Sequence, residues 1–229
     1  MAPRYGLLFD VDGVIADTEA VNAAASIRVF ADLFGLQGVE RRDFEAGLGR
    51  GAAAYVRAAA EVHGVSLTDE QVEKATRLRQ DYFLADLRDR PLPAFPGVLE
   101  LMNAALVRED FGVAIATSST REKSEAVLRS AGVPYHRMAY VAGSDVTHKK
   151  PHPELFLTAA QRAGVLPEHC VVIEDAPNGI AAAHAAGCRC IAVTNSAVAE
   201  KLAVADHVVS SLSEVSIGDV TGLLQRADS

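Results

Sequence analysis

The sequence has few of the features that mark secreted, membrane-spanning or disulfide-bonded proteins. It holds three cysteines in 229 residues, Cys170, Cys188 and Cys190, and so sparse and odd a set does not form a disulfide framework. It also has no apolar run long enough to cross a bilayer. The short apolar stretch near its N-terminus runs directly into Asp10 and Asp12, so we expect no signal peptide.

Basic residues are scarce as well. The chain has 22 Lys and Arg against 30 Asp and Glu, which gives a net charge of -8, and no long basic cluster interrupts this balance. Binding to nucleic acid depends on neutralising phosphates, so the composition argues against a nucleic-acid partner. With 49% hydrophobic residues the chain can bury a core. We expect a cytoplasmic protein, or one of a reducing, stroma-like compartment if a transit peptide has been removed.

Short apolar runs rich in valine and isoleucine alternate with longer amphipathic segments. The runs cover residues 5–9, 112–116, 138–142, 170–173, 190–193 and, more weakly, 207–209. Runs that are apolar on both faces are typical of a buried parallel sheet. The helical segments are predicted at residues 119–131, with Ser119 and Glu122 as a capping box, at 153–163, where Pro153 lies in the first turn and Gly164 ends the helix, and at 178–186. The alternation predicts an α/β fold with a doubly wound, Rossmann-like parallel sheet.

Residues 20–90 differ from the rest, because they contain no convincing strand. Helices are predicted at residues 20–34, 52–63 and 69–87, and Thr68 with Gln71 forms a second capping box. A turn-rich stretch at 91–97 ends this block. We therefore predict a catalytic core formed by residues 1–19 and 91–229, and an inserted α-helical cap domain formed by residues 20–90.

The strongest chemical motif is Asp10-Val11-Asp12-Gly13, directly after the first strand. Two carboxylates at this spacing leave the strand end on the same side, where parallel sheets bind ligands. One could be a nucleophile or metal ligand and the other a proton donor. The alternatives are an ordinary Asp-Gly turn, or a calcium loop, although the further oxygen ligands that such a loop needs are missing.

Two more motifs follow the next strands. Thr117 and Ser118 offer a hydroxyl and N–H groups at a helix N-terminus, which suits a phosphate, while Ser119 can simply be the N-cap. Lys150 lies close to two prolines just before a helix, a rigid presentation for a cation. The alternative is a solvated turn with surface lysines, which we prefer for Lys149.

A second pair of acids, Glu174 and Asp175, follows the strand at 170–173. With Asp10 and Asp12 it would place four carboxylates on one sheet edge. Like charges repel there, and a bound cation is the usual resolution. Oxygen ligands with room for water suit Mg²⁺. The alternative is that the pair only caps the following helix.

These four elements, in this order, closely resemble the haloacid dehalogenase superfamily of phosphotransferases over nearly the whole chain. The insert is similar to the helical cap of the subgroup that contains β-phosphoglucomutase and related sugar-phosphate phosphatases. The dehalogenases of the superfamily lack the aspartate that is Asp12 here. The resemblance therefore points to phosphoryl transfer.

By this resemblance, Asp10 attacks the substrate phosphorus and becomes an aspartyl-phosphate, and Asp12 protonates the leaving oxygen and later accepts a proton from water. Mg²⁺ would be held by Asp10, Asp175 and the backbone carbonyl of Asp12, with Glu174 assisting, directly or through water. Lys150 would hold Asp10 and the phosphate together.

The same resemblance assigns the remaining site residues. Thr117 and the N–H of Ser118 would bind phosphoryl oxygens. In the cap, Arg50 and Arg79 match positions that contact substrate phosphate, although either could be a solvated helix charge. Thr18 and Glu19 close the first loop and would line the hinge.

The resemblance leaves the reaction open between a phosphatase and a mutase. Asn22 matches a histidine of β-phosphoglucomutase that couples cap closure to the proton donor, and asparagine cannot titrate. We therefore predict hydrolysis of a small phosphorylated metabolite, a sugar phosphate or bisphosphate, with a sugar-phosphate mutase as the alternative. A phosphonoacetaldehyde hydrolase would need a cap lysine, and Lys74 has no special context. A catalytically inactive binding protein is the remaining alternative. We expect no membrane or nucleic-acid partner, and a monomer or weak dimer.

Overall fold

The computed structural model describes residues 3–47 and 51–225. Its contacts divide the chain into two compact units. We call Met1–Asp17 with Leu92–Ser229 the core unit, and Thr18–Pro91 the insert unit. Thr18 and Glu19, which we had expected in the core, thus fall in the insert unit.

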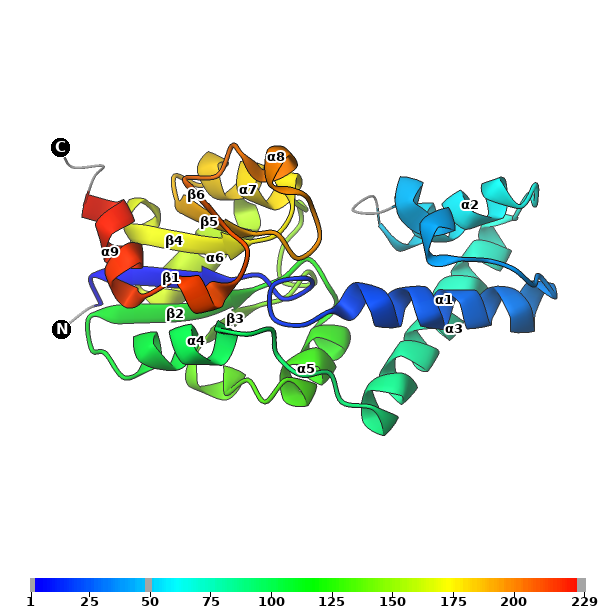
Figure 1. The fold of residues 1–229 in the computed structure, drawn as a ribbon, viewed down its shortest axis with the longest axis horizontal. Helices are drawn as coiled ribbons and strands as arrows, with labels where there is room; N and C mark the ends of the chain where they lie inside the picture. The colour runs from blue at the N-terminus through cyan, green and yellow to red at the C-terminus, as the bar shows by residue number, and fades with distance from the viewer. Residues whose placement is uncertain (1–2, 48–50, 226–229) are drawn as a thin grey trace. The chain divides into compact units, whose positions relative to one another are not determined.

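The core unit is built on a parallel sheet whose strand order is β3-β2-β1-β4-β5-β6 within the described residues (Figure 1). The strands are β1 Tyr5–Phe9, β2 Phe111–Ala116, β3 Ala139–Val141, β4 Cys170–Glu174, β5 Arg189–Val193 and β6 His207–Val209. This is the doubly wound order, in which the chain turns to opposite sides of β1. The predicted Rossmann-like α/β fold is confirmed.

Helices cover both faces of this sheet. They are α4 Val98–Leu106, α5 Arg121–Ser130, α6 Glu154–Ala163, α7 Pro177–Ala185, α8 Ala199–Leu202 and α9 Ile217–Gln225, with 3₁₀ turns η2 Tyr135–Arg137, η3 Pro167–His169 and η4 Leu212–Glu214. Alternate strand residues face opposite sides, so Leu8, Ala114 and Val172 join one apolar cluster with residues of α6 and α7. On the other face α4 packs on β2 and α9 on β4.

One predicted helix start is wrong. Ser119 does not cap the helix that follows β2, because α5 begins at Arg121 and its N-cap is Thr120, whose hydroxyl accepts from the N–H of Lys123. The Ser119 hydroxyl instead donates to the carboxylate of Asp12. The end of α6 follows the prediction, with Gly164 in a left-handed conformation at the C-cap, whereas Pro153 is the N-cap, one residue before the helix, rather than part of its first turn.

The described residues of the insert unit form helices joined by loops, without a strand. It consists of α1 Thr18–Phe34, the 3₁₀ helix η1 Arg41–Gly47, α2 Ala52–Val62 and α3 Asp69–Asp89. The capping box of Thr68 and Gln71 is present at the start of α3, as predicted. Aromatic side chains lie in the hydrophobic core of this unit, where the ring of Phe44 stacks on that of Tyr55 at 4.7 Å between centroids.

The structure bears on membrane-spanning helices and on the cysteines. Among the helices of residues 3–47 and 51–225, none is both long and apolar enough to span a bilayer. All three cysteines are buried and free, and burial raises the pKa of the Cys190 thiol. A disulfide framework is therefore absent from the described chain.

Candidate active site

The register of the sheet brings the two acidic motifs together. Strands β1 and β4 are neighbours, with Phe9 beside Ile173, so Asp10 follows β1 at the level of Glu174. The N–H of Asp10 continues the ladder and donates to the carbonyl of Ile173 at 3.1 Å. This is the position where the strand order reverses, and open α/β sheets bind ligands at the carboxyl ends of their strands there.

Lys150 joins the two motifs through its ammonium group. Its Nζ lies 2.6 Å from Asp10 Oδ1 and 2.5 Å from Glu174 Oε1. The three side chains are buried, with exposed fractions of 7%, 8% and 1% for Lys150, Asp10 and Glu174. Removing one member of such a buried group would leave an uncompensated charge away from water, so the three positions depend on one another.

The electrostatics of this cluster favour a further positive charge. Burial, together with the carboxylates of Glu174 and Asp12, raises the pKa of Asp10 to about 7, although Lys150 acts in the opposite direction. Burial, Glu174 and Asp10 also hold the pKa of Asp175 well above its usual range. Burial works against the charge of Lys150, but Asp10 and Glu174 raise its pKa overall. The buried carboxyl groups of Asp10, Glu174 and Asp175 thus lie around a single buried ammonium, that of Lys150.

The donor set fits a hard divalent cation. Asp10 and Asp175 supply carboxylate oxygens, and an ion of charge two would remove the repulsion that raises both pKa values. Both carboxylate oxygens of Glu174 already accept hydrogen bonds, Oε1 from the Lys150 ammonium and Oε2 from the N–H groups of Asp175 and Ala176 at 2.9 and 3.1 Å. These contacts favour an indirect role for Glu174 at such an ion.

The turn after Asp12 is shaped around Asp175. Gly13 has a φ of +79°, and a Cβ at this position would lie 1.8 Å from Asp175 Oδ2 and 2.4 Å from the Ser196 hydroxyl. Only glycine fits such a space. Asn195 fixes the turn further by donating from Nδ2 to the carbonyl of Gly13 at 2.8 Å. Asn195 and Ser196 carry no sequence motif, and the prediction missed them.

The carboxylate of Asp12 is held by two side chains that the sequence analysis did not assign. The Ser119 hydroxyl donates to Asp12 Oδ2 at 2.6 Å, and Lys123 Nζ donates to Oδ1 at 2.8 Å. Ser119 lies just before the N-cap of α5 and Lys123 lies in its first turn, and no motif in the sequence marks this pair. Both oxygens of the Asp12 carboxylate thus accept hydrogen bonds from the start of the segment that follows β2.

The loop after β2 lies beside the same edge. Thr117 is buried, its N–H donates to the carbonyl of Val141, and its hydroxyl accepts from the N–H of Ser119 at 3.1 Å. Ser118 is exposed. Lys149 is exposed, as expected for a surface lysine, and its ammonium donates to the carbonyl of Gly143.

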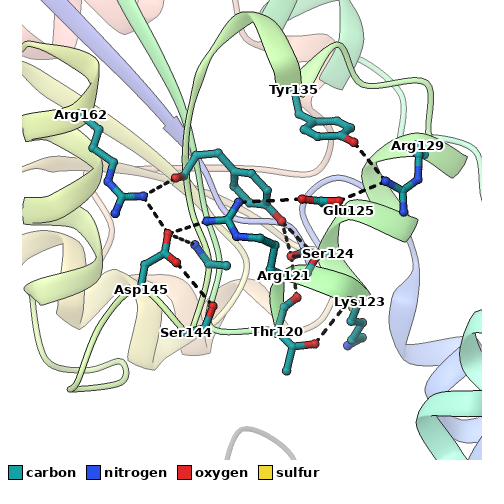
Figure 2. A network of polar contacts seen from close by, with 12 residues as sticks. Thr120, Arg121, Lys123, Ser124, Glu125, Arg129, Tyr135, Ser144, Asp145 and Arg162 are labelled. Carbon is teal, nitrogen blue, oxygen red and sulfur yellow. Dashed lines mark hydrogen bonds and ion pairs between the residues drawn. The ribbon is translucent and has the colours of Figure 1, made fainter.

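A polar network supports the segment that leads to Lys150. Asp145 accepts hydrogen bonds from Arg121 of α5 and Arg162 of α6, both at 2.7 Å (Figure 2). Arg162 also donates to the carbonyl of Tyr140 in β3 at 2.7 Å. These contacts tie the chain after β3 to the two neighbouring helices, so the approach to Lys150 is fixed from both sides.

The insert unit brings together two of its predicted site residues. Glu19 Oε1 accepts from the hydroxyl of Tyr55 at 2.6 Å, and the Arg79 guanidinium lies 5.3 Å from the centroid of the same ring. Burial and the Glu19 carboxylate raise the pKa of Tyr55. Thr18 is buried at the start of α1. Arg50 lies outside the described residues.

Comparisons with known proteins agree with this arrangement. The profile of the haloacid dehalogenase-like hydrolases matches residues 6–187. The fructose-1-phosphate phosphatase YqaB of Escherichia coli is 35% identical over 190 residues, covering 82% of this chain and 95% of that protein. The chloroplastic protein SUPPRESSOR OF QUENCHING 1 of Arabidopsis thaliana is 34% identical over 93% of this chain, which spans 20% of that protein's length.

A solved structure has the same fold. The crystal structure of CbbY from Rhodobacter sphaeroides in complex with phosphate superposes with a TM-score of 0.83 at 27% identity, covering 95% of this chain and 99% of that one. The similarity therefore extends over both units rather than over the sheet alone.

Proposed function

The chain belongs to the haloacid dehalogenase-like hydrolase family and is a phosphoric monoester hydrolase, and from this we propose that it dephosphorylates a small metabolite through an aspartyl-phosphate on Asp10. The observation that carries the proposal is the buried contact of Lys150 with Asp10 at the switch point of the sheet. A carboxylate is a weak nucleophile, and phosphoryl transfer depends mainly on placement and neutralised charge.

The reaction has two steps. In the first, a carboxylate oxygen of Asp10 bonds to phosphorus as the bond to the substrate oxygen breaks. Asp12, which must first take up a proton in place of its ion pair with Lys123, gives that proton to the leaving oxygen. In the second, Asp12 takes a proton from water as the water oxygen bonds to phosphorus. The bond to Asp10 then breaks, which releases inorganic phosphate and regenerates both carboxyl groups.

The surrounding residues place these groups. Lys150 holds Asp10 and offsets charge on the phosphoryl oxygens, and Glu174 in turn orients Lys150. Ser119 and Lys123 position the carboxylate of Asp12. We further propose that Thr117 and the N–H of Ser118 bind phosphoryl oxygens.

We propose Mg²⁺ as the cofactor, held by Asp10, Asp175 and the Asp12 carbonyl. Bound there, Mg²⁺ would reduce the repulsion between the nucleophile and an anionic phosphate. Chelation should abolish turnover, and added Mg²⁺ should restore it.

The proposed substrate is a sugar phosphate or bisphosphate. YqaB acts on fructose 1-phosphate, as its name states, and aligns with most of this chain. We propose that the insert unit selects the substrate as a cap, with Thr18, Glu19, Arg79 and Arg50 among its contacts. A monomer or weak dimer in a reducing compartment stays a prediction.

Replacing the nucleophile tests the proposal. Wild-type protein with Mg²⁺ should release inorganic phosphate from at least one member of a panel of sugar phosphates and bisphosphates. Asp10→Asn should abolish this release. Asp110→Asn is the matched control, because Asp110 is an exposed partner of Arg108 at the opposite, amino-terminal edge of the sheet. Near-wild-type turnover in Asp10→Asn would refute the mechanism.

The same assay separates the alternative functions. A mutase would convert β-glucose 1-phosphate to glucose 6-phosphate with little phosphate released, whereas a phosphatase releases phosphate stoichiometrically. No turnover of any substrate by the wild type would favour an inactive binding protein.

A further inference from the structure

A second group of potential metal ligands lies outside the carboxylate cluster. His148, His152 and Glu154 each offer one ligand atom, and these atoms lie within 4.8 Å of one another. The segment leaves the Lys150 turn and enters α6. Both histidines are exposed and Glu154 is half-buried, so solvent ions can reach the group.

The contacts within the group hold its members close together. Nδ1 of His148 lies 2.7 Å from Glu154 Oε2, and the two imidazole rings are 4.4 Å apart between centroids. The N–H of Glu154 donates to Nδ1 of His152 at 3.3 Å. In a tetrahedral zinc site with bonds of about 2 Å, ligand atoms lie about 3.3 Å apart. Ligand atoms at most 4.8 Å apart are thus within about 1.5 Å of that spacing.

Backbone N–H groups hold the Glu154 carboxylate in place, in contrast to Glu174, whose Oε1 contacts the positively charged Lys150 ammonium. Its Oε1 accepts from the N–H of Thr147 at 2.9 Å, and its Oε2 accepts from the N–H of His148 at 2.8 Å. These bonds, with the contact to His148, lower the pKa of Glu154 to about 2, so it is ionised at neutral pH. Backbone groups that orient a ligating carboxylate are the supporting shell that metal sites use.

The donor types determine which ion would bind. Two imidazoles and one carboxylate, with water in the fourth position, form a donor set that holds zinc. Imidazole nitrogen suits Zn²⁺, Cu²⁺ and Ni²⁺, whereas Mg²⁺ prefers oxygen alone. The group therefore differs in selectivity from the cluster around Asp10. We propose that His148, His152 and Glu154 form a transition-metal site of the zinc type beside the Lys150 turn.

The competing explanation is purely structural. Glu154 would then only cap the preceding turn and form an ion pair with His148, whose side chain is 60% exposed. Such exposed pairs contribute little to stability. Under this explanation His152 has no effect on metal affinity, which makes it the decisive residue.

Calorimetry with Zn²⁺ tests the proposal. Tag-free full-length protein is saturated with Mg²⁺, so that the carboxylate cluster is occupied, and is then titrated with Zn²⁺. We expect one Zn²⁺ per chain, with affinity at least tenfold weaker in His148→Ala and in His152→Ala. The matched control is His136→Ala, an exposed histidine in η2, which should bind like the wild type.

Two further measurements exclude a trivial result. Co²⁺ should give the intense visible absorption of a four- or five-coordinate site in the wild type, and this should disappear in His152→Ala. Hydrogen exchange of residues 147–152 should slow when Zn²⁺ is added, because the ion links both sides of the turn. Equal Zn²⁺ affinity in the wild type, His148→Ala and His152→Ala would overturn the proposal. None of these readouts depends on phosphatase activity.

Discussion

Gly179 lies in α7, four residues after Asp175, and the structure predicts that its replacement by alanine disrupts the active site. A Cβ at residue 179 would lie 1.9 Å from Cδ and Oε1 of Glu174, whereas ordinary contacts are 3.4–4 Å. Glu174 is almost fully buried. Its carboxylate must therefore move by more than an ångström, or α7 must shift.

The cost follows from what the Glu174 carboxylate contacts. Moving it lengthens the bonds from the N–H groups of Asp175 and Ala176 and the contact with Lys150. Hydrogen bonds to charged groups contribute about 1.5–3 kcal/mol each, so losing the two backbone bonds alone costs about 3–6 kcal/mol. This is a large part of the about 5–15 kcal/mol that a folded domain has in total.

A double-mutant cycle isolates the cause. In urea unfolding, Gly179→Ala should cost about 3–6 kcal/mol in the wild-type background. In a Glu174→Ala background, where the clash is absent, the same substitution should cost at least about 2 kcal/mol less. Gly222→Ala in α9 is the matched control, since a Cβ there meets nothing within 4 Å. It should stabilise by about 1 kcal/mol through helix propensity. An equal cost of Gly179→Ala in both backgrounds would refute the reasoning.

Three further outcomes are expected. Lys123→Met should lower kcat about tenfold with little change in KM, because Lys123 only positions Asp12. Asp12→Asn should lower kcat by roughly 10²- to 10⁴-fold. The control Lys201→Met, on the exposed face of α8, should leave both constants unchanged. Since the pKa of Asp10 is raised to about 7 and that of Asp175 is raised as well, Mg²⁺ must displace at least one proton below pH 7, and calorimetry should show its affinity falling by roughly tenfold or more per pH unit there. Burial opposes ionisation of Asp145, but its arginine partners lower its pKa below 3.8. The stabilisation from its ionised form is therefore present at neutral pH and is lost on acidification. Asp145→Asn should lower the free energy of unfolding in urea by about 1 kcal/mol at pH 7 and by less near pH 3.

Much of the fold is determined locally, and the sequence therefore predicts it. Apolar runs on both faces identify the buried strands, and Gly164 and the pair Thr68–Gln71 mark helix ends through short-range hydrogen bonds. The acidic pairs after β1 and β4 follow from the same pattern, because strand ends of a parallel sheet share one edge. The capping prediction at Ser119 failed because a residue distant in sequence, Asp12, competes for its hydroxyl.

The partners of these groups depend on tertiary structure. The contact of Lys150 with Asp10 spans 140 residues, and that of Lys123 with Asp12 spans 111. No spacing rule connects positions so far apart, since only the strand order and register bring them together. The residue types in the sequence thus determine which chemistry is available. The tertiary packing decides the protonation of these side chains, because burial and neighbouring charges set the pKa of Asp10.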